Sequence, residues 1–182
     1  MRVEKTAILG VVEIYPDVFN DERGHFFESF RDTTYSDKGL PSIFRQVNQA
    51  SSQKDVLRGL HYQLAHPQGK LVRVISGRIR DVAVDIRKRS PTYGHYEISQ
   101  LTDKNNKMLY IPEGFAHGYV VESDLAVVEY HCTDIYVPDD QFGINWNDPD
   151  LNISWGISTP ILSEKDKELP FLKEQKYLPA YK

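Results

Sequence analysis

The sequence contains a single cysteine, Cys132, so it can form no internal disulfide. It has no apolar run long enough to span a membrane, and its first residues, MRVEKTAILG, lack the apolar core of a signal peptide. It also lacks an excess of positive charge, since the net charge is -4 at pH 7. We therefore expect a cytoplasmic protein that binds neither nucleic acid nor a membrane, because both of those surfaces attract basic proteins.

Low-complexity segments, internal repeats and linkers rich in Pro, Gly or Ser are also missing. A chain of 182 residues is long enough for one domain with a substantial core, and we expect a single domain over residues 1–182. Aromatic residues are plentiful, with 11 Tyr and 8 Phe, and this composition favours β structure.

One strand is clear from its alternation. Residues 81–88, DVAVDIRK, place three aliphatic side chains on one face and a more polar set, which includes Asp81 and Asp85, on the other. Helical signals are weaker and lie near the ends of the sequence. Residues 31–40 predict one short helix, and residues 163–169 predict another that begins at a Ser163 cap.

Further strands surround this one. Residues 70–80 read as a strand, a turn at Ser76–Gly77 and a returning strand, and residues 107–112 read as another strand. Residues 118–132 read as a hairpin whose second strand has one face formed by Ala126, Val128, Tyr130 and Cys132. Many short strands separated by turns indicate a β-sandwich or β-barrel.

A motif for metal binding is only partly present. Pro112, Gly114 and His117 have the spacing P-x-G-x-x-H, which resembles the second motif of the cupins, a superfamily of jelly-roll barrels. The first cupin motif contains H-x-H, but here His61 is followed by Gln63. A metal site needs at least three protein ligands, and the spacing of His25 and His66 does not suggest that they complete one. We therefore predict no metal and no cofactor.

His61 has two other interpretations. A single histidine in an apolar strand is usually a core residue bonded to a backbone carbonyl. However, His61, His117 and Tyr130 can all point into one barrel, which has room for one small ligand. An imidazole is a competent base near neutral pH and a phenol is a competent acid. These residues therefore predict proton removal on one face of a carbon and proton delivery on the other.

Arg58 and His61 raise a question of geometry, since the side chains of a regular strand alternate and these two would point to opposite faces. If both face one ligand, the strand must break its register between them. Gly59 is the natural position for a bulge.

Seven blocks in order carry a family resemblance from about residue 8 to residue 170. They are DERGHFFESF, VLRGLHYQ, PQGKLVRVISG, DVAVDIRKRSPTYG, IPEGFAHGYVV, WNDPDLNISW and LSEKD. Together they resemble the dTDP-4-dehydrorhamnose 3,5-epimerases, a family of metal-independent cupins. The resemblance implies an all-β cupin jelly-roll barrel with a few short helices near the ends. It also implies a homodimer whose N-terminal strands pair across the interface.

The resemblance further implies the reaction, which is the 3,5-epimerisation of dTDP-4-dehydro-6-deoxy-D-glucose to dTDP-4-dehydro-L-rhamnose in dTDP-L-rhamnose biosynthesis. It makes His61 the base, Tyr130 the proton donor, Asp166 the partner of His61 and Lys70 the cation near the keto oxygen. From the residues alone, Asp166 fits a capping box with Ser163, Tyr130 fits a core residue, and Lys70 fits a solvated lysine.

Substrate-binding positions are implied in the same way. They are Arg23, Glu28, Gln46, Asn48, Arg58, Lys70, His117, Tyr136 and Lys165. Arg58 would hold the diphosphate, Tyr136 would stack on the thymine ring, and Arg23 and Glu28 would serve the partner subunit. Taken singly, each charged residue among them is more typical of a solvated surface.

Three positions depart from the family pattern. Gln141 stands where many members have a glutamate that contacts the nucleotide, which puts the nucleotide in question, and His131 and Val47 replace a common lysine and aspartate. Three rival functions also remain open. They are epimerisation at carbon 3 or carbon 5 alone, sugar-nucleotide binding by a noncatalytic cupin, and metal-dependent cupin chemistry.

Overall fold

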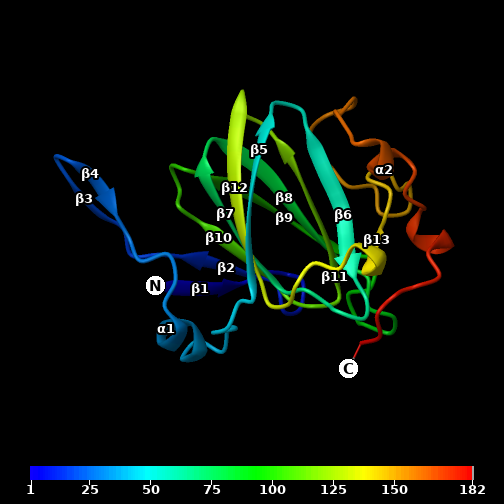
Figure 1. Cartoon of the computed structure of the whole chain (residues 1–182), viewed down its shortest axis with the longest axis horizontal. Helices are drawn as coiled ribbons and strands as arrows, with labels where there is room; N and C mark the ends of the chain where they lie inside the picture. Colours follow the sequence, from blue (N-terminus) through cyan, green and yellow to red (C-terminus); the bar gives the residue numbers. More distant parts are fainter. Residues whose placement is uncertain (182) are drawn as a thin grey trace.

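The computed structural model describes residues 1–181, and two antiparallel sheets form its body (Figure 1). The six-stranded sheet has the order β1-β2-β10-β7-β12-β5, with bounds Arg2–Lys5, Val12–Tyr15, Met108–Ile111, Lys70–Ser76, Leu125–Cys132 and Gln46–Gln53. The five-stranded sheet has the order β13-β6-β11-β8-β9, with bounds Gln141–Gly143, Leu57–Gln63, Phe115–Val121, Arg78–Asp85 and Tyr96–Thr102. The predicted all-β jelly roll is therefore confirmed.

The helices are few and short. The α-helix α1 covers Asp32–Ser36 and α2 covers Glu164–Lys167, and the 3-10 turns cover Pro138–Asp140 and Leu172–Glu174. Both predicted helices are thus present, and Ser163 caps α2 by accepting a hydrogen bond from the Asp166 amide at 3.1 Å. Within residues 1–181, no helix has the length and the apolar character needed to cross a bilayer.

Two hairpins that the sequence predicts do not form, although their strands do. β7 and β8 join at Gly77 and β11 and β12 join near Ser123, yet in each case the two strands belong to different sheets. Gly77 has φ +87°, and a Cβ there would lie 2.2 Å from the Leu125 carbonyl oxygen. The turn is therefore a sharp corner between two sheets. A turn signal locates the reversal of the chain but does not say which strands pair.

Apolar side chains fill the space between the sheets and also cover the outside of the five-stranded sheet. The inner cluster contains Val72 and Val128 from one sheet and Ala83 from the other. On the outer face, Val82 and Val84 pack with Trp155 and other residues of the C-terminal segment, which runs beside β6 and β13 (Figure 1). The polar face of β8 consequently points inward, which buries Asp81 and Asp85 completely.

Asp85 belongs to a structural network. Its carboxylate accepts hydrogen bonds from Arg87 (2.7 and 2.9 Å) and from the hydroxyls of Ser90 (2.5 Å) and Thr92 (2.7 Å). Burial alone would raise the pKa of Asp85, but these bonds outweigh it and lower the pKa below its usual value. The buried charge at Asp85 is therefore fully compensated and is not available to a ligand.

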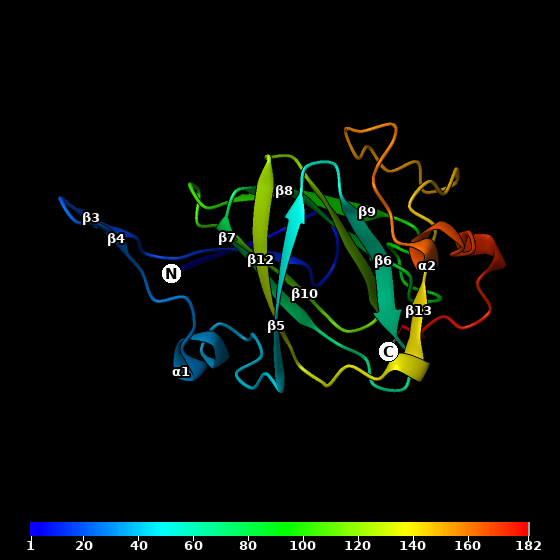
Figure 2. The ribbon, with the colours of Figure 1, turned by 45° about the horizontal axis from the view of Figure 1, so that its top comes forward.

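A small hairpin extends away from the body. It consists of β3 (Phe19–Asp21) and β4 (Gly24–Phe26), and both views show it projecting from the N-terminal side of the sheets (Figures 1 and 2). Its side chains are exposed, including Phe19 at 67% and Phe26 at 71%. We call this hairpin the arm. Two exposed phenylalanines on a projecting element indicate a contact surface.

Candidate active site

A cavity of about 520 Å³ lies between the two sheets, and most of the predicted site residues line it. This volume suits a small ligand. The predicted residues that line it are Gln46, Asn48, Arg58, His61, Lys70, His117, Tyr130, Tyr136 and Asp166.

The bulge expected at Gly59 is present. β6 pairs with β11 so that His61 faces His117 and Arg58 faces Tyr119, which leaves one extra residue on β6 between the two pairs. Gly59 has φ +107°, and a Cβ there would lie 2.6 Å from the His117 carbonyl oxygen. Only glycine fits this close approach without strain. The extra residue turns Arg58 and His61 toward the same cavity.

His61 and Asp166 form a close pair. Asp166 Oδ1 lies 2.6 Å from His61 Nε2, and Asp166 Oδ2 accepts a longer bond from the Gly59 amide at 3.4 Å. Burial would raise the pKa of Asp166, but the bonds and charge of His61, with the Gly59 amide and Ser163, outweigh burial and lower the pKa. The carboxylate is therefore ionised and accepts the Nε2 proton, so in the neutral imidazole the lone pair is on Nδ1.

Asp166 both completes a helix cap and serves as the partner of His61. Its backbone amide completes the helix cap with Ser163, as the capping pattern predicts, while its carboxylate points to His61. The cap therefore fixes the position from which the carboxylate reaches the imidazole.

Lys70 and Tyr130 approach the cavity from the opposite sheet, on β7 and β12. Burial lowers the pKa of the Lys70 ammonium, and the nearby Asp81 and Cys132 oppose that shift. Burial raises the pKa of the Tyr130 hydroxyl, which keeps it protonated at neutral pH. The cavity thus has an imidazole on one wall and a phenol with a buried amine on the other.

Asp81 is a site residue that the sequence interpretation missed. Its carboxylate accepts a hydrogen bond from His117 Nε2 at 2.9 Å, and both side chains are buried. Burial lowers the pKa of His117, and Asp81 opposes this shift. The alternation of residues 81–88 places Asp81 on the face opposite the aliphatic residues, but it does not show that this face lies inside.

Gln63 holds a loop in place. Its amide nitrogen donates to the carbonyl oxygens of His66 (2.7 Å) and Ile135 (3.0 Å), and its oxygen accepts from the Val137 amide at 2.8 Å. A carboxamide can donate two hydrogen bonds through its nitrogen and accept through its oxygen, whereas a neutral imidazole has one donor nitrogen and one acceptor nitrogen. Gln63 therefore anchors the loop that carries Tyr136 beside the cavity.

Tyr136 is further held by two glutamines. Its amide donates to Gln46 Oε1 at 2.7 Å, and its hydroxyl donates to Gln141 Oε1 at 2.9 Å. Gln46 in turn donates to Asn48 Oδ1 at 2.8 Å. Tyr136 is 43% exposed and lines the cavity, so its ring is accessible to a planar ligand.

Three predicted residues do not line the cavity. Arg23 lies on the arm and pairs with Asp21, and Glu28 follows the arm and pairs with Arg31. Lys165 is exposed on α2, next to Asp166. Within residues 1–181, no group of three or more His, Cys, Asp or Glu side chains is arranged to hold a metal ion.

Comparison with known proteins agrees with this geometry. Residues 5–174 match the family described as dTDP-4-dehydrorhamnose 3,5-epimerase. The enzyme of that description from Methanothermobacter thermautotrophicus is 47% identical, over 95% of each chain. A crystal structure of a dTDP-6-deoxy-D-glucose-3,5-epimerase from Legionella pneumophila, in complex with dTDP-4-keto-L-rhamnose, is 43% identical with a TM-score of 0.96, over 100% of this chain and 98% of that one.

A more distant relative differs in its reaction. A dTDP-4-dehydrorhamnose 3-epimerase from Streptomyces niveus is 36% identical, over 100% of this chain and 90% of its own length. A match over nearly the whole chain, at this identity and with a shared fold, shows common descent. The chain therefore belongs to the dTDP-4-dehydrorhamnose 3,5-epimerase family of sugar-nucleotide isomerases.

Proposed function

We propose that the protein inverts carbons 3 and 5 of dTDP-4-dehydro-6-deoxy-D-glucose and so forms dTDP-4-dehydro-L-rhamnose. The observation that carries this proposal is the placement of an oriented imidazole and a protonated phenol on opposite walls of one cavity. His61 is positioned by Asp166 at 2.6 Å on β6, and Tyr130 lies on β12 of the facing sheet. Inversion at a carbon needs a base on one side and an acid on the other.

The chemistry follows from the keto group at carbon 4. This group acidifies the hydrogens on carbons 3 and 5, and His61 Nδ1 removes one of them. The C–H electron pair moves into the ring to form an enolate whose oxygen bears the charge. Tyr130 then donates its proton to the same carbon from the opposite face. The imidazolium of His61 releases the abstracted proton to solvent and the Tyr130 phenolate takes one up from solvent, and the same two steps at the second carbon then complete the reaction.

Lys70 has a separate role in this proposal. In its protonated form, the Lys70 ammonium beside the cavity stabilises the enolate oxygen that forms there. Asp81 lies close to Lys70 and to His117, and it supplies the negative charge that favours the protonated amine. The fixed dipoles and charges of this wall therefore match the charge that develops during proton removal.

Binding of the rest of the substrate is assigned to the other cavity residues. Arg58 and His117 lie beside His61 and can hold the diphosphate and the sugar, and Tyr136 offers its accessible ring to the thymine. Lys165, exposed on α2 next to Asp166, would contribute positive charge to substrate binding. The net charge of -4 argues against a nucleic acid, and the anionic substrate would be held by local cations such as Arg58.

The proposal is tested by incubating the protein with dTDP-4-dehydro-6-deoxy-D-glucose in deuterated water. We expect deuterium at both carbon 3 and carbon 5 and the L-rhamno product, measured by NMR and mass spectrometry. Label at only one carbon would instead identify a monoepimerase, and the existence of a 3-epimerase relative at 36% identity makes this the main alternative. No label with retained binding would identify a noncatalytic sugar-nucleotide-binding protein.

We further propose that the protein is a homodimer whose N-terminal strands pair across the interface. β1 is an edge strand of the six-stranded sheet, so its outer edge can pair with a second chain. The arm projects from the same region with Phe19 and Phe26 exposed. A second copy that covers the arm would bring Arg23 and Glu28 to the partner's cavity, which explains why neither lines its own.

Replacing Phe19 and Phe26 together by Asp is expected to weaken the dimer and to raise KM, because charged side chains disfavour burial of the arm. Light scattering measures the mass, and enzyme assays over a range of protein concentrations measure the loss of activity. Leu125→Asp is the matched control, since Leu125 is 50% exposed on β12, which β2, β10 and β7 separate from β1 in the sheet. A fully active monomeric wild-type protein would show that the dimer proposal is wrong.

A further inference from the structure

Tyr119 lies in the wall of the cavity but has no role in the mechanism above. It is on β11, two residues after His117, so both side chains point to the same side of the strand. Its neighbours across the two adjacent strands are Arg58 and Asp81. Its ring is 3% exposed and belongs to the inner apolar cluster, against which Tyr130 also packs.

The hydroxyl of Tyr119 is the unusual feature. Among the buried side-chain atoms of residues 1–181, Tyr119 Oη is the one nitrogen or oxygen that has no hydrogen-bond partner. Ser52 lies near enough to influence the pKa of Tyr119, but the two hydroxyls do not meet the distance and angle of a hydrogen bond, and Ser52 Oγ accepts from Arg58 Nε at 3.0 Å. A buried hydroxyl without a partner is costly, and such groups are rare in proteins.

The protonation state of this hydroxyl is clear. Burial raises the pKa of Tyr119 to about 12, and the nearby charge of Arg58 opposes the shift only in part. The group therefore stays protonated at neutral pH. It is a hydrogen-bond donor that faces a ligand cavity and has no acceptor in the protein.

We infer that Tyr119 Oη donates a hydrogen bond to an oxygen of the bound sugar and so helps to determine which sugar the protein accepts. The position favours the sugar over the nucleotide base, because Tyr119 pairs with Arg58 beside the bulge and lies near Tyr130 of the facing sheet. The thymine-binding side of the cavity, around Tyr136 and Gln141, is formed by a different loop. This inference rests on the proposed function and adds a binding residue to it.

The test compares Tyr119→Phe with its parent in a His61→Ala background that prevents turnover. Calorimetry measures Kd for dTDP-4-dehydro-6-deoxy-D-glucose and for dTDP. We expect the sugar nucleotide to bind about 2- to 10-fold more weakly, as for the loss of one neutral hydrogen bond, and dTDP to bind unchanged. We also expect the melting temperature of ligand-free Tyr119→Phe to equal or exceed that of the parent, because the change removes an unpaired polar group.

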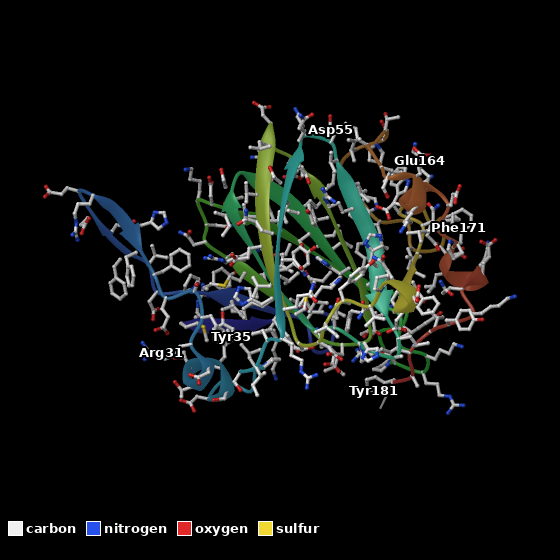
Figure 3. All side chains as sticks on the ribbon, viewed as in Figure 1. Arg31, Tyr35, Asp55, Glu164, Phe171 and Tyr181 are labelled. Carbon is white, nitrogen blue, oxygen red and sulfur yellow. The ribbon has the colours of Figure 1, made fainter. Side chains whose placement is uncertain are left out.

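Tyr35→Phe is the matched control. Tyr35 is equally buried, but it lies on α1 away from the cavity (Figure 3), and its hydroxyl donates to the Ser29 carbonyl at 3.0 Å. This variant should melt at a lower temperature and keep both affinities. The pair therefore separates a ligand-binding hydroxyl from a structural one.

Two results would overturn the inference. One is an unchanged Kd for the sugar nucleotide together with a lower melting temperature, which would mean that the hydroxyl is satisfied within the free protein. The other is an equal loss of affinity for dTDP and for the sugar nucleotide, which would mean that Tyr119 contacts the diphosphate and not the sugar. Failure of the proposed function is a separate outcome, seen as absence of deuterium exchange in the wild-type protein, and it leaves the sugar contact testable by the same Kd values.

Discussion

His61→Ala is expected to abolish deuterium incorporation at both carbon 3 and carbon 5, with a loss of about 10²–10⁴-fold in rate. Exchange should be lost at both carbons because both flank the same keto group and His61 is the one base assigned to the site. The affinity for dTDP should be retained, since the anionic part of the ligand is assigned to Arg58 and His117. NMR measures exchange at each carbon, and calorimetry measures binding.

The control for His61→Ala is His66→Ala. His66 is exposed, lies three residues after the end of β6 and does not line the cavity, so this variant should exchange deuterium normally. Asp166→Asn provides a second check, because an amide cannot hold the Nε2–H tautomer as an ionised carboxylate does. It should slow exchange at both carbons in parallel. Normal exchange in His61→Ala would mean that another group is the base.

Tyr130→Phe is expected to reduce net inversion by about 10²–10⁴-fold while deuterium exchange falls less. The reason is that removal of the substrate proton by His61 does not require the phenol, and His61 can return a deuteron to the face from which it took the proton. Substrate should therefore become labelled without change of configuration. The ratio of labelled substrate to inverted product, measured by NMR over time, is the diagnostic quantity.

Tyr35→Phe serves as the control here as well, because it removes a buried phenolic hydroxyl outside the cavity. It should leave the ratio of exchange to inversion at the wild-type value. Equal losses of exchange and inversion in Tyr130→Phe would mean that Tyr130 supports binding or the enolate, and that the proton comes from another donor.

The local features of the site were largely predictable from the sequence. The bulge at Gly59 follows from the requirement that Arg58 and His61 face one ligand, and a glycine between them supplies the freedom to do so. The cap at Ser163 likewise follows from a short pattern. Both features depend on residues within a few positions of one another, which is the range over which spacing determines conformation.

Features that depend on strand pairing were predicted poorly. The expected hairpins at Gly77 and near Ser123 are instead corners between sheets, because the hydrophobic alternation of a strand is satisfied by any partner that buries the same face. For the same reason the burial of Asp81 was not predicted, since alternation divides β8 into two faces without showing which of them lies inside.

By itself, the sequence determined the all-β class, several of the central strands and both short helices, the glutamine at position 63 in place of a motif histidine, and the family. Tertiary structure decided which distant residues meet. His61 and Asp166 are 105 positions apart and form a 2.6 Å pair, and the phenol of Tyr130 comes to the same cavity from the other sheet. The physical reason is that periodicity and turn chemistry act over a few residues, whereas the closure of two sheets around a cavity is a property of the whole chain.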